Sequence, residues 1–179
     1  MNFDQAFDRL MGLEGGYSNH AADRGGQTNW GVTETAARNF GYRGEMRALP
    51  QSVARQIYRQ DYWDELKLEA IAQQAPQLAW KLFDIGVNMG TGRAAQFLQR
   101  TLNVLNRAGR DYPDLRIDGA IGPKSLDSLQ CLLTLRGPDA ETVIVRALNA
   151  LQAVSYIELS ERDPSQETFT YGWLWQRVA

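Results

Sequence analysis

The chain has 179 residues, 44% of them hydrophobic and 22% charged, with a formal net charge of −2 at pH 7. This balance predicts a globular protein with a well-buried core and argues against disorder. Because there is no overall basic charge, nucleic-acid binding driven by phosphate neutralisation is disfavoured. The single cysteine, Cys131, cannot form an intramolecular disulfide, and its apolar surroundings predict a buried structural thiol.

The N-terminal residues lack the basic and apolar regions of a secretory signal peptide. No stretch of the chain approaches the ~20 apolar residues that a membrane-spanning helix needs. We therefore expect synthesis in the cytoplasm and no stable insertion into a membrane.

The first half of the chain predicts helices around one irregular segment. An apolar stripe from Phe3 to Met11 predicts a helix that ends at the glycine pair 15–16. Residues 17–32 have no helical period, and their glycines indicate tight turns with at most a small β-hairpin. A short helix is expected from about residue 33, and a longer one after Pro50.

The second half predicts further helices, so the expected fold class is mainly α. One face of the helix beginning at Pro76 carries apolar residues, and further helices follow Thr91, Pro123 and Asp139. Asp139 has the side chain of a good N-cap. The aromatic tail 169–178 is expected to dock as a last short helix, and the turn-rich connector 106–122 is the candidate domain boundary.

The polar chemistry of the chain is concentrated in GLEGGYSNHAADRGGQTNWGVT, residues 12–33. Glu14 lies four residues after Leu10 and continues the apolar stripe of the first helix. Partial desolvation and the negative end of the helix dipole would both raise the pKa of this carboxyl, which suits a general acid. Alternatively, Glu14 turns out to water at a frayed helix end.

Asp23 and Thr28 follow Glu14 in the same glycine-rich segment. If the segment folds back over the helix end, both face Glu14 across a cleft. An acidic pair with a hydroxyl suits glycoside hydrolysis, in which one group protonates the leaving oxygen and the others position water or stabilise positive charge. In the alternative interpretation Asp23 forms an Asx-turn and Thr28 caps a turn.

Other catalytic chemistries fit the sequence poorly. The only histidine, His20, excludes a zinc site built on two histidines, and no cysteine cluster replaces it. Cys131 lacks neighbours that would stabilise a thiolate, no G-x-S-x-G motif is present, and the glycines do not have phosphate-loop spacing. Carboxylate chemistry remains, and it needs neither a metal ion nor an organic cofactor.

Aromatic side chains add surfaces on which sugars could stack. Tyr17 and Trp30 are candidates for a cleft, although core positions are an equal alternative. Tyr58, Tyr62 and Trp63 are assigned mainly to the core.

Three segments resemble the glycoside hydrolase family 108 muramidases, which are bacterial and phage lysozyme-like proteins. EGGYSNHAADRGGQTNWGVT is similar to the family signature E-G-G-Y…D-x-G-G-x-T-N-x-G-[IV]-T, and WKLFDIGVNMGTGRAAQFLQ is similar to its second block. IDGAIGPKSLDSL resembles the family's small C-terminal region. The resemblance covers nearly the whole chain. It implies a lysozyme-like helical fold, with a catalytic region over residues 1–95 and a helical peptidoglycan-binding-like region over 96–179.

The resemblance also implies roles for individual residues. The family's catalytic glutamate falls on Glu14, and a parallel with phage-type lysozymes gives Asp23 and Thr28 the task of holding the attacking water. The residues expected to contact substrate are Tyr17, His20, Asn29, Trp30, Asp84 and Asn88. Asp84 and Asn88 are one helical turn apart, and simple solvation of that helix face is the alternative.

The implied activity is hydrolysis of the β-1,4 bond between N-acetylmuramic acid and N-acetylglucosamine in peptidoglycan glycan strands. Two alternatives stay open, a non-catalytic peptidoglycan-binding or secretion-accessory protein and a chitinase-like enzyme. A wall-degrading enzyme without a signal peptide needs a holin or an export system for its release before it acts in the periplasm or outside. A monomer is the simplest expectation.

Overall fold

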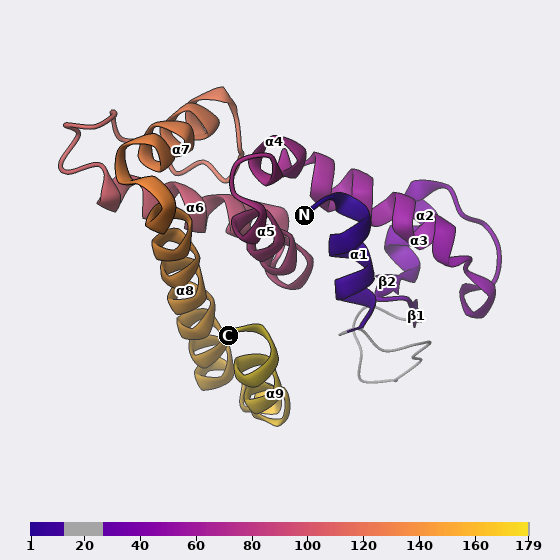
Figure 1. Ribbon diagram of the computed structural model, residues 1–179. Coiled ribbons are helices and arrows are strands. Elements are labelled where there is room, and N and C mark those ends of the chain that lie inside the picture. Colours follow the sequence, from indigo (N-terminus) through magenta and orange to yellow (C-terminus); the bar gives the residue numbers. More distant parts are fainter. Residues whose placement is uncertain (13–26, 179) are drawn as a thin grey trace.

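The computed structural model describes residues 1–12 and 27–178, so Glu14, Tyr17, His20 and Asp23 lie outside the described residues. The described chain is mainly helical with one two-stranded hairpin, which confirms the expected fold class (Figure 1). The hairpin consists of β1 (Thr28–Asn29) and β2 (Val32–Thr33). The α-helices are α1 (Phe3–Met11), α2 (Glu34–Phe40), α3 (Gln51–Tyr58), α4 (Leu68–Ala72), α5 (Pro76–Met89), α6 (Thr91–Leu105), α7 (Pro123–Arg136), α8 (Ala140–Arg162) and α9 (Glu167–Arg177). Short 3-10 turns cover Met46–Ala48, Gly137–Asp139 and Pro164–Gln166, and a π-helical turn covers Arg59–Asp64.

Helix α1 begins at a reciprocal cap and buries the predicted stripe. The Asn2 side chain accepts from the Gln5 backbone N–H at 2.9 Å, and the Gln5 side chain accepts from the Asn2 N–H at 3.0 Å. The buried side chains are Phe3, Ala6, Phe7 and Leu10. The helix ends at Met11 with Gly12 as its C-cap, which is earlier than the glycine pair 15–16 predicted. Glycine has a low helix propensity, so the first glycine of the segment already favours an end.

Helix α5 forms the centre of the molecule and starts with Pro76 at its first position, as predicted. Every residue from 78 to 86 is buried, including Lys81 and Asp84. The sequence predicted one apolar face on this helix, but the helix is buried on all sides, because α1, α4, α6 and α8 all pack around α5. Edge-to-face contacts of the Phe83 ring with Phe3 and Trp63, at 6.3 and 5.7 Å, join α5 to the N-terminal elements.

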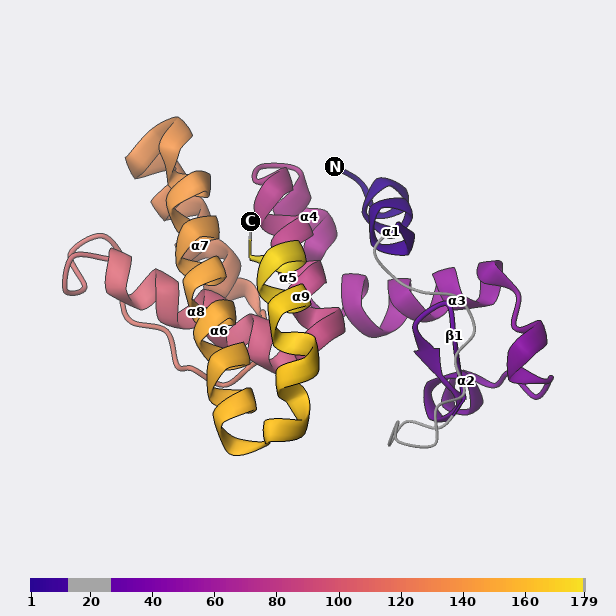
Figure 2. The same cartoon turned by 90° about the horizontal axis from the view of Figure 1, so that it is seen from below.

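Helices α8 and α9 form an antiparallel pair that lies in front of α5 when the molecule is seen from below (Figure 2). The Trp173 ring of α9 stacks on Tyr156 of α8 with 5.1 Å between centroids. The tail is thus a docked helix, as predicted.

Asp139 makes no side-chain capping bond to α8, so its predicted role was wrong. Its backbone already has helical angles in the preceding 3-10 turn, whereas an N-cap side chain needs extended backbone.

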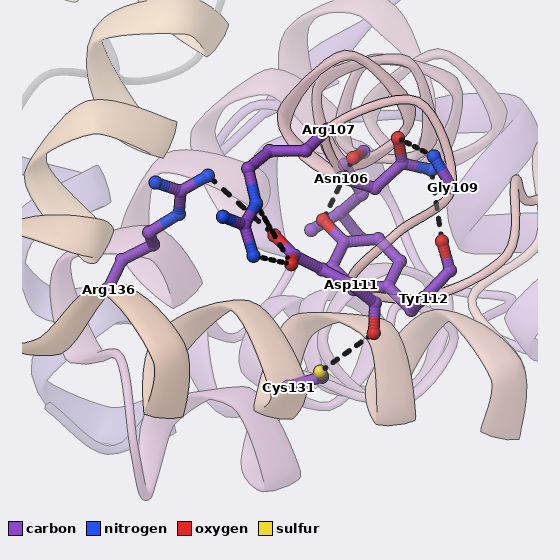
Figure 3. Close-up of polar contacts among 8 residues, drawn as sticks. Asn106, Arg107, Gly109, Asp111, Tyr112, Cys131 and Arg136 are labelled. Carbon is purple, nitrogen blue, oxygen red and sulfur yellow. Dashed lines mark hydrogen bonds and ion pairs between the residues drawn. The ribbon is translucent and has the colours of Figure 1, made fainter.

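The connector 106–122 begins with a tightly bonded turn (Figure 3). The Asn106 side chain donates to the Tyr112 carbonyl at 3.1 Å and accepts from the Gly109 N–H at 3.0 Å. Arg107 and Ala108 both have left-handed backbone angles, with φ of 55° and 57°. Such angles are unfavourable for residues with a Cβ, so the Asn106 bonds hold the turn against that cost.

The carboxylate of Asp111 ties the same connector to its neighbours (Figure 3). The Arg107 Nε lies 3.0 Å from both Asp111 oxygens, and Arg136 of α7 lies 3.7 Å away. The hydrogen bond from Arg107 lowers the pKa of Asp111. Cys131 of α7 is half-buried, not fully buried as predicted, because its thiol faces the connector and donates to the Asp111 carbonyl at 3.5 Å. The connector therefore packs against the helices as part of the fold.

Among the described residues, no helix is both long enough and apolar enough to cross a membrane.

Candidate functional site

The hairpin lies just after the segment that carries Glu14 and Asp23. Thr28 pairs with Thr33 and Asn29 with Val32, which leaves Trp30 and Gly31 as a two-residue loop. Their φ angles are 54° and 72°, and two positive angles in succession are the requirement of a type I′ hairpin turn. Gly31 adopts this conformation freely, whereas Trp30 must be held in it by its contacts.

Trp30 is half-buried and is fixed at two atoms. Its indole Nε1 donates to the Leu49 carbonyl at 3.0 Å, and its own carbonyl accepts from the Tyr58 hydroxyl at 3.1 Å. The Tyr58 ring packs edge-on against Phe7 of α1, with 5.7 Å between centroids. Tyr58, the last residue of α3, therefore connects α1 to the hairpin. Tyr58 is buried in the core, as is Trp63, in agreement with the sequence.

Asn29 attaches the hairpin to the turn at Met46–Ala48. Its side-chain Nδ2 donates to the Met46 carbonyl at 2.9 Å and to the Arg47 carbonyl at 3.2 Å, and the residue is 6% exposed. Both amide hydrogens are therefore used by the fold. Contact of Asn29 with substrate stays a prediction, and only its side-chain oxygen could take part while these bonds are in place.

Thr28 is half-buried in β1, and Gln27 separates it from residues 13–26, which lie outside the described part of the chain. The residue that caps α2 is its cross-strand partner Thr33, whose hydroxyl accepts from the Ala36 N–H at 3.3 Å. The described residues on either side of 13–26 are Gly12, the C-cap of α1, and Gln27, which precedes β1. The catalytic roles of Glu14, Asp23 and Thr28, and the substrate contacts of Tyr17 and His20, stay predictions.

Asp84 lies in a buried network between α5, α8 and α9, and it is 2% exposed. Its Oδ1 accepts from Arg177 Nη1 at 2.6 Å, and its Oδ2 accepts from Gln152 Nε2 at 3.2 Å. Asn88 joins the same network, because with its amide turned to match its neighbours its oxygen accepts from Arg177 Nε at 3.3 Å. Solvation of this helix face, the simple alternative, is therefore wrong for Asp84.

Lys81, Gln152 and Arg177 were not found from the sequence. Lys81 is 4% exposed, and its Nζ donates to Gln152 Oε1 at 2.5 Å and to the Arg177 carbonyl. Burial lowers the pKa of Lys81 to about 8, while Asp84 acts in the opposite direction. A lysine between Trp80 and Leu82 in an apolar helix was a usable signal. Nothing in the sequence links it to residues so far along the chain.

Within residues 1–12 and 27–178, no group of three or more His, Cys, Asp or Glu side chains is placed to hold a metal ion.

Comparisons with known proteins divide the chain into two parts. Residues 7–90 match the family model described as Glycosyl hydrolase 108, and residues 93–178 match the model described as Predicted Peptidoglycan domain. Among solved structures, the chain is similar to Brucella abortus SagA, with a TM-score of 0.61 and 21% identity over 96% of this chain and 95% of that chain. At this identity the likeness shows a shared fold. No curated protein matches the chain.

Proposed function

We propose that the chain is a peptidoglycan N-acetylmuramidase, because residues 7–90 match the Glycosyl hydrolase 108 model and residues 93–178 match the Predicted Peptidoglycan domain model. It hydrolyses the β-1,4 bond between N-acetylmuramic acid and N-acetylglucosamine. The observation that carries the proposal is the family match together with Glu14, Asp23 and Thr28 inside the matched range.

In the proposed reaction Glu14 is the general acid and protonates the glycosidic oxygen that leaves with N-acetylglucosamine. Asp23, with Thr28, positions the water that adds to C1 of N-acetylmuramic acid or stabilises the positive charge that develops there. Arg24, the residue next to Asp23, would favour the ionised form of that carboxylate.

Two aromatic side chains of α9 support contact with glycan in the second half of the chain. Tyr171 and Trp175 are 80% and 75% exposed. They are four residues apart and therefore lie on the same face of the helix, about 6 Å from each other along its axis. Exposed aromatic rings at this spacing offer flat surfaces on which successive sugar rings can stack.

The first test is digestion of purified bacterial peptidoglycan, followed by turbidity and by mass spectrometry of the new reducing ends. We expect reducing N-acetylmuramic acid ends from the wild type and a loss of about 10²- to 10⁴-fold for Glu14→Gln, which is the usual contribution of a general acid. Glu65→Gln is the matched control, since Glu65 is an exposed carboxyl elsewhere in the same region.

Each other outcome would contradict part of the proposal. Binding without cleavage by the wild type would leave the non-catalytic accessory role. Reducing N-acetylglucosamine ends, or equal cleavage of chitin oligomers, would assign a different bond. Full activity of Glu14→Gln would remove Glu14 as the acid.

We also propose that the protein acts as a monomer outside the cytoplasm after release by a holin or an export route. Size-exclusion chromatography would check the monomer, and cell fractionation would check the location.

A further inference from the structure

A cavity of about 160 Å³ lies where α1, α5, α8 and α9 meet. It lies between the two parts of the chain, because Arg9 and α5 fall within the glycosyl hydrolase match, and α8 and α9 fall within the peptidoglycan domain match. The charged residues that line it are Arg9 from α1, Lys81 and Asp84 from α5, and Arg177 from α9. The indole of Trp80 forms part of the wall.

The described lining carries more positive than negative charge. Asp84 is its single described carboxylate, and that carboxylate is bonded to Arg177 at 2.6 Å. No other carboxylate of the described lining is therefore left to balance the positive charges of Lys81 and Arg9. Lys81 lies 3.8 Å from Asp84 Oδ2, which is beyond hydrogen-bond reach. Arg177 and the exposed Arg9 both repel the charged form of buried Lys81, and an anion that entered the cavity would offset this repulsion.

Arg9 is placed to meet such an anion at the cavity's edge. It is exposed, and its guanidinium carbon lies 4.3 Å from the centroid of the Trp80 ring. Stacking on the indole holds the plane of the guanidinium while its N–H groups stay free to donate at the edges. A guanidinium held in this way suits bidentate pairing with a carboxylate.

We propose that this cavity is a binding site for a carboxylate of the peptidoglycan stem peptide, held by Arg9 and Lys81. The proposal rests on the proposed function, because peptidoglycan is the polymer that brings the peptide to the protein. Stem peptides carry carboxylates on D-glutamate, on diaminopimelate and at the chain end. The cavity lies on α1, and Glu14 follows the C-cap of that helix by two residues in the sequence.

Titration of Lys81 provides an independent signature of binding. The groups that face it are Asp84 on its own helix, Arg177 on α9, Arg9 on α1, and Gln152 with the Tyr156 phenol on α8. The pKa of Lys81 is lowered to about 8, while that of Tyr156 is raised to about 12, so the phenol stays neutral where the lysine titrates. A bound carboxylate favours charged Lys81, so binding at pH 8 should take up as much as about half a proton.

The test is calorimetric titration of the full chain with the tripeptide L-Ala-γ-D-Glu-meso-diaminopimelate, beside the same peptide with its carboxyls amidated and beside inorganic phosphate. At pH 8 we expect the acid peptide to bind with proton uptake, measured in buffers of different ionisation enthalpy. Arg9→Gln should weaken binding at least about tenfold, as loss of a charge-assisted hydrogen bond does. Lys81→Met should remove the proton uptake. Arg100→Gln, on the exposed face of α6, is the charge-matched control.

No binding of the acid peptide, equal binding of the amidated peptide, or an unchanged affinity in Arg9→Gln would overturn the proposal. Equal binding of inorganic phosphate would show a general oxyanion site and overturn the assignment to the stem peptide. Should Lys81→Met fail to fold, Arg9→Gln and the proton uptake of the wild type still decide. The tripeptide contains no glycosidic bond, so its binding is measured separately from glycan cleavage, and either proposal can fail without the other.

Discussion

The buried ion pair between Asp84 and Arg177 attaches α9 to the central helix α5, and removing one partner should destabilise the whole chain. Both side chains are nearly inaccessible, with 3% of the Asp84 side chain and 8% of the Arg177 side chain exposed. In Arg177→Met the methionine fills most of the space but leaves the carboxylate without its 2.6 Å partner. Breaking a buried pair from one side typically costs about 3–5 kcal/mol, because an uncompensated charge remains.

The structure places the expected cost at the lower end of that range. Gln152 still donates to Asp84 at 3.2 Å, and the Lys81 ammonium at 3.8 Å still compensates part of the charge. We therefore expect a loss of about 3 kcal/mol in the free energy of unfolding. For a chain of this length, that loss lowers Tm by roughly 6–12 °C.

Urea unfolding at pH 7, followed by circular dichroism, measures this change. Arg146→Met is the control, because Arg146 is an exposed arginine of α8 outside the network. A double-mutant cycle with Asp84→Asn should give a coupling energy of about 1–3 kcal/mol between the two residues. An Arg177→Met variant as stable as the Arg146→Met control, or a coupling energy near zero, would refute the assignment of this pair to the core.

Three more outcomes are expected. Tyr58→Phe removes the hydroxyl that donates to the Trp30 carbonyl at 3.1 Å, so it should lower the free energy of unfolding by about 1 kcal/mol in urea titrations. Because the pKa of Lys81 is lowered to about 8, the unfolded chain binds more protons between pH 8 and its ordinary pKa of 10.5. From pH 7.5 to 9.5 the stability of the wild type should therefore rise by about 1–2 kcal/mol relative to Lys81→Met. Replacing the exposed Tyr171 and Trp175 by serine should weaken sedimentation with peptidoglycan at unchanged Tm.

Each of these three predictions can be contradicted by a specific result. Tyr58→Phe keeps the ring that packs on Phe7, so a loss far above about 1 kcal/mol would mean that the ring contact had changed as well. If stability rose with pH equally in the wild type and in Lys81→Met, groups other than Lys81 would carry the effect. Unchanged sedimentation of the serine double variant would leave the face of α9 without a role in glycan binding.

The local elements were determined by the sequence itself. The cap and apolar stripe of α1, proline at the first position of α5 and α7, and Thr33 before α2 each act within a few residues, so they could be read without the fold. The segment at residues 12–33 was recognisable for the same reason, because its glycines, carboxylates and aromatic residues are close together in the chain.

The tertiary structure decided what depends on residues far apart in the sequence. From the sequence, Asp84 was interpreted as a residue on a helix face. In the structure α8 and α9 cover it, and Gln152 and Arg177 donate to its carboxylate. Lys81 is an ordinary lysine until burial lowers its pKa. The strength of an electrostatic interaction depends on distance and solvent exposure, and both are set by packing. For this reason the sequence indicated where the catalytic chemistry lies, and only the fold revealed the charged cavity between the two parts of the chain.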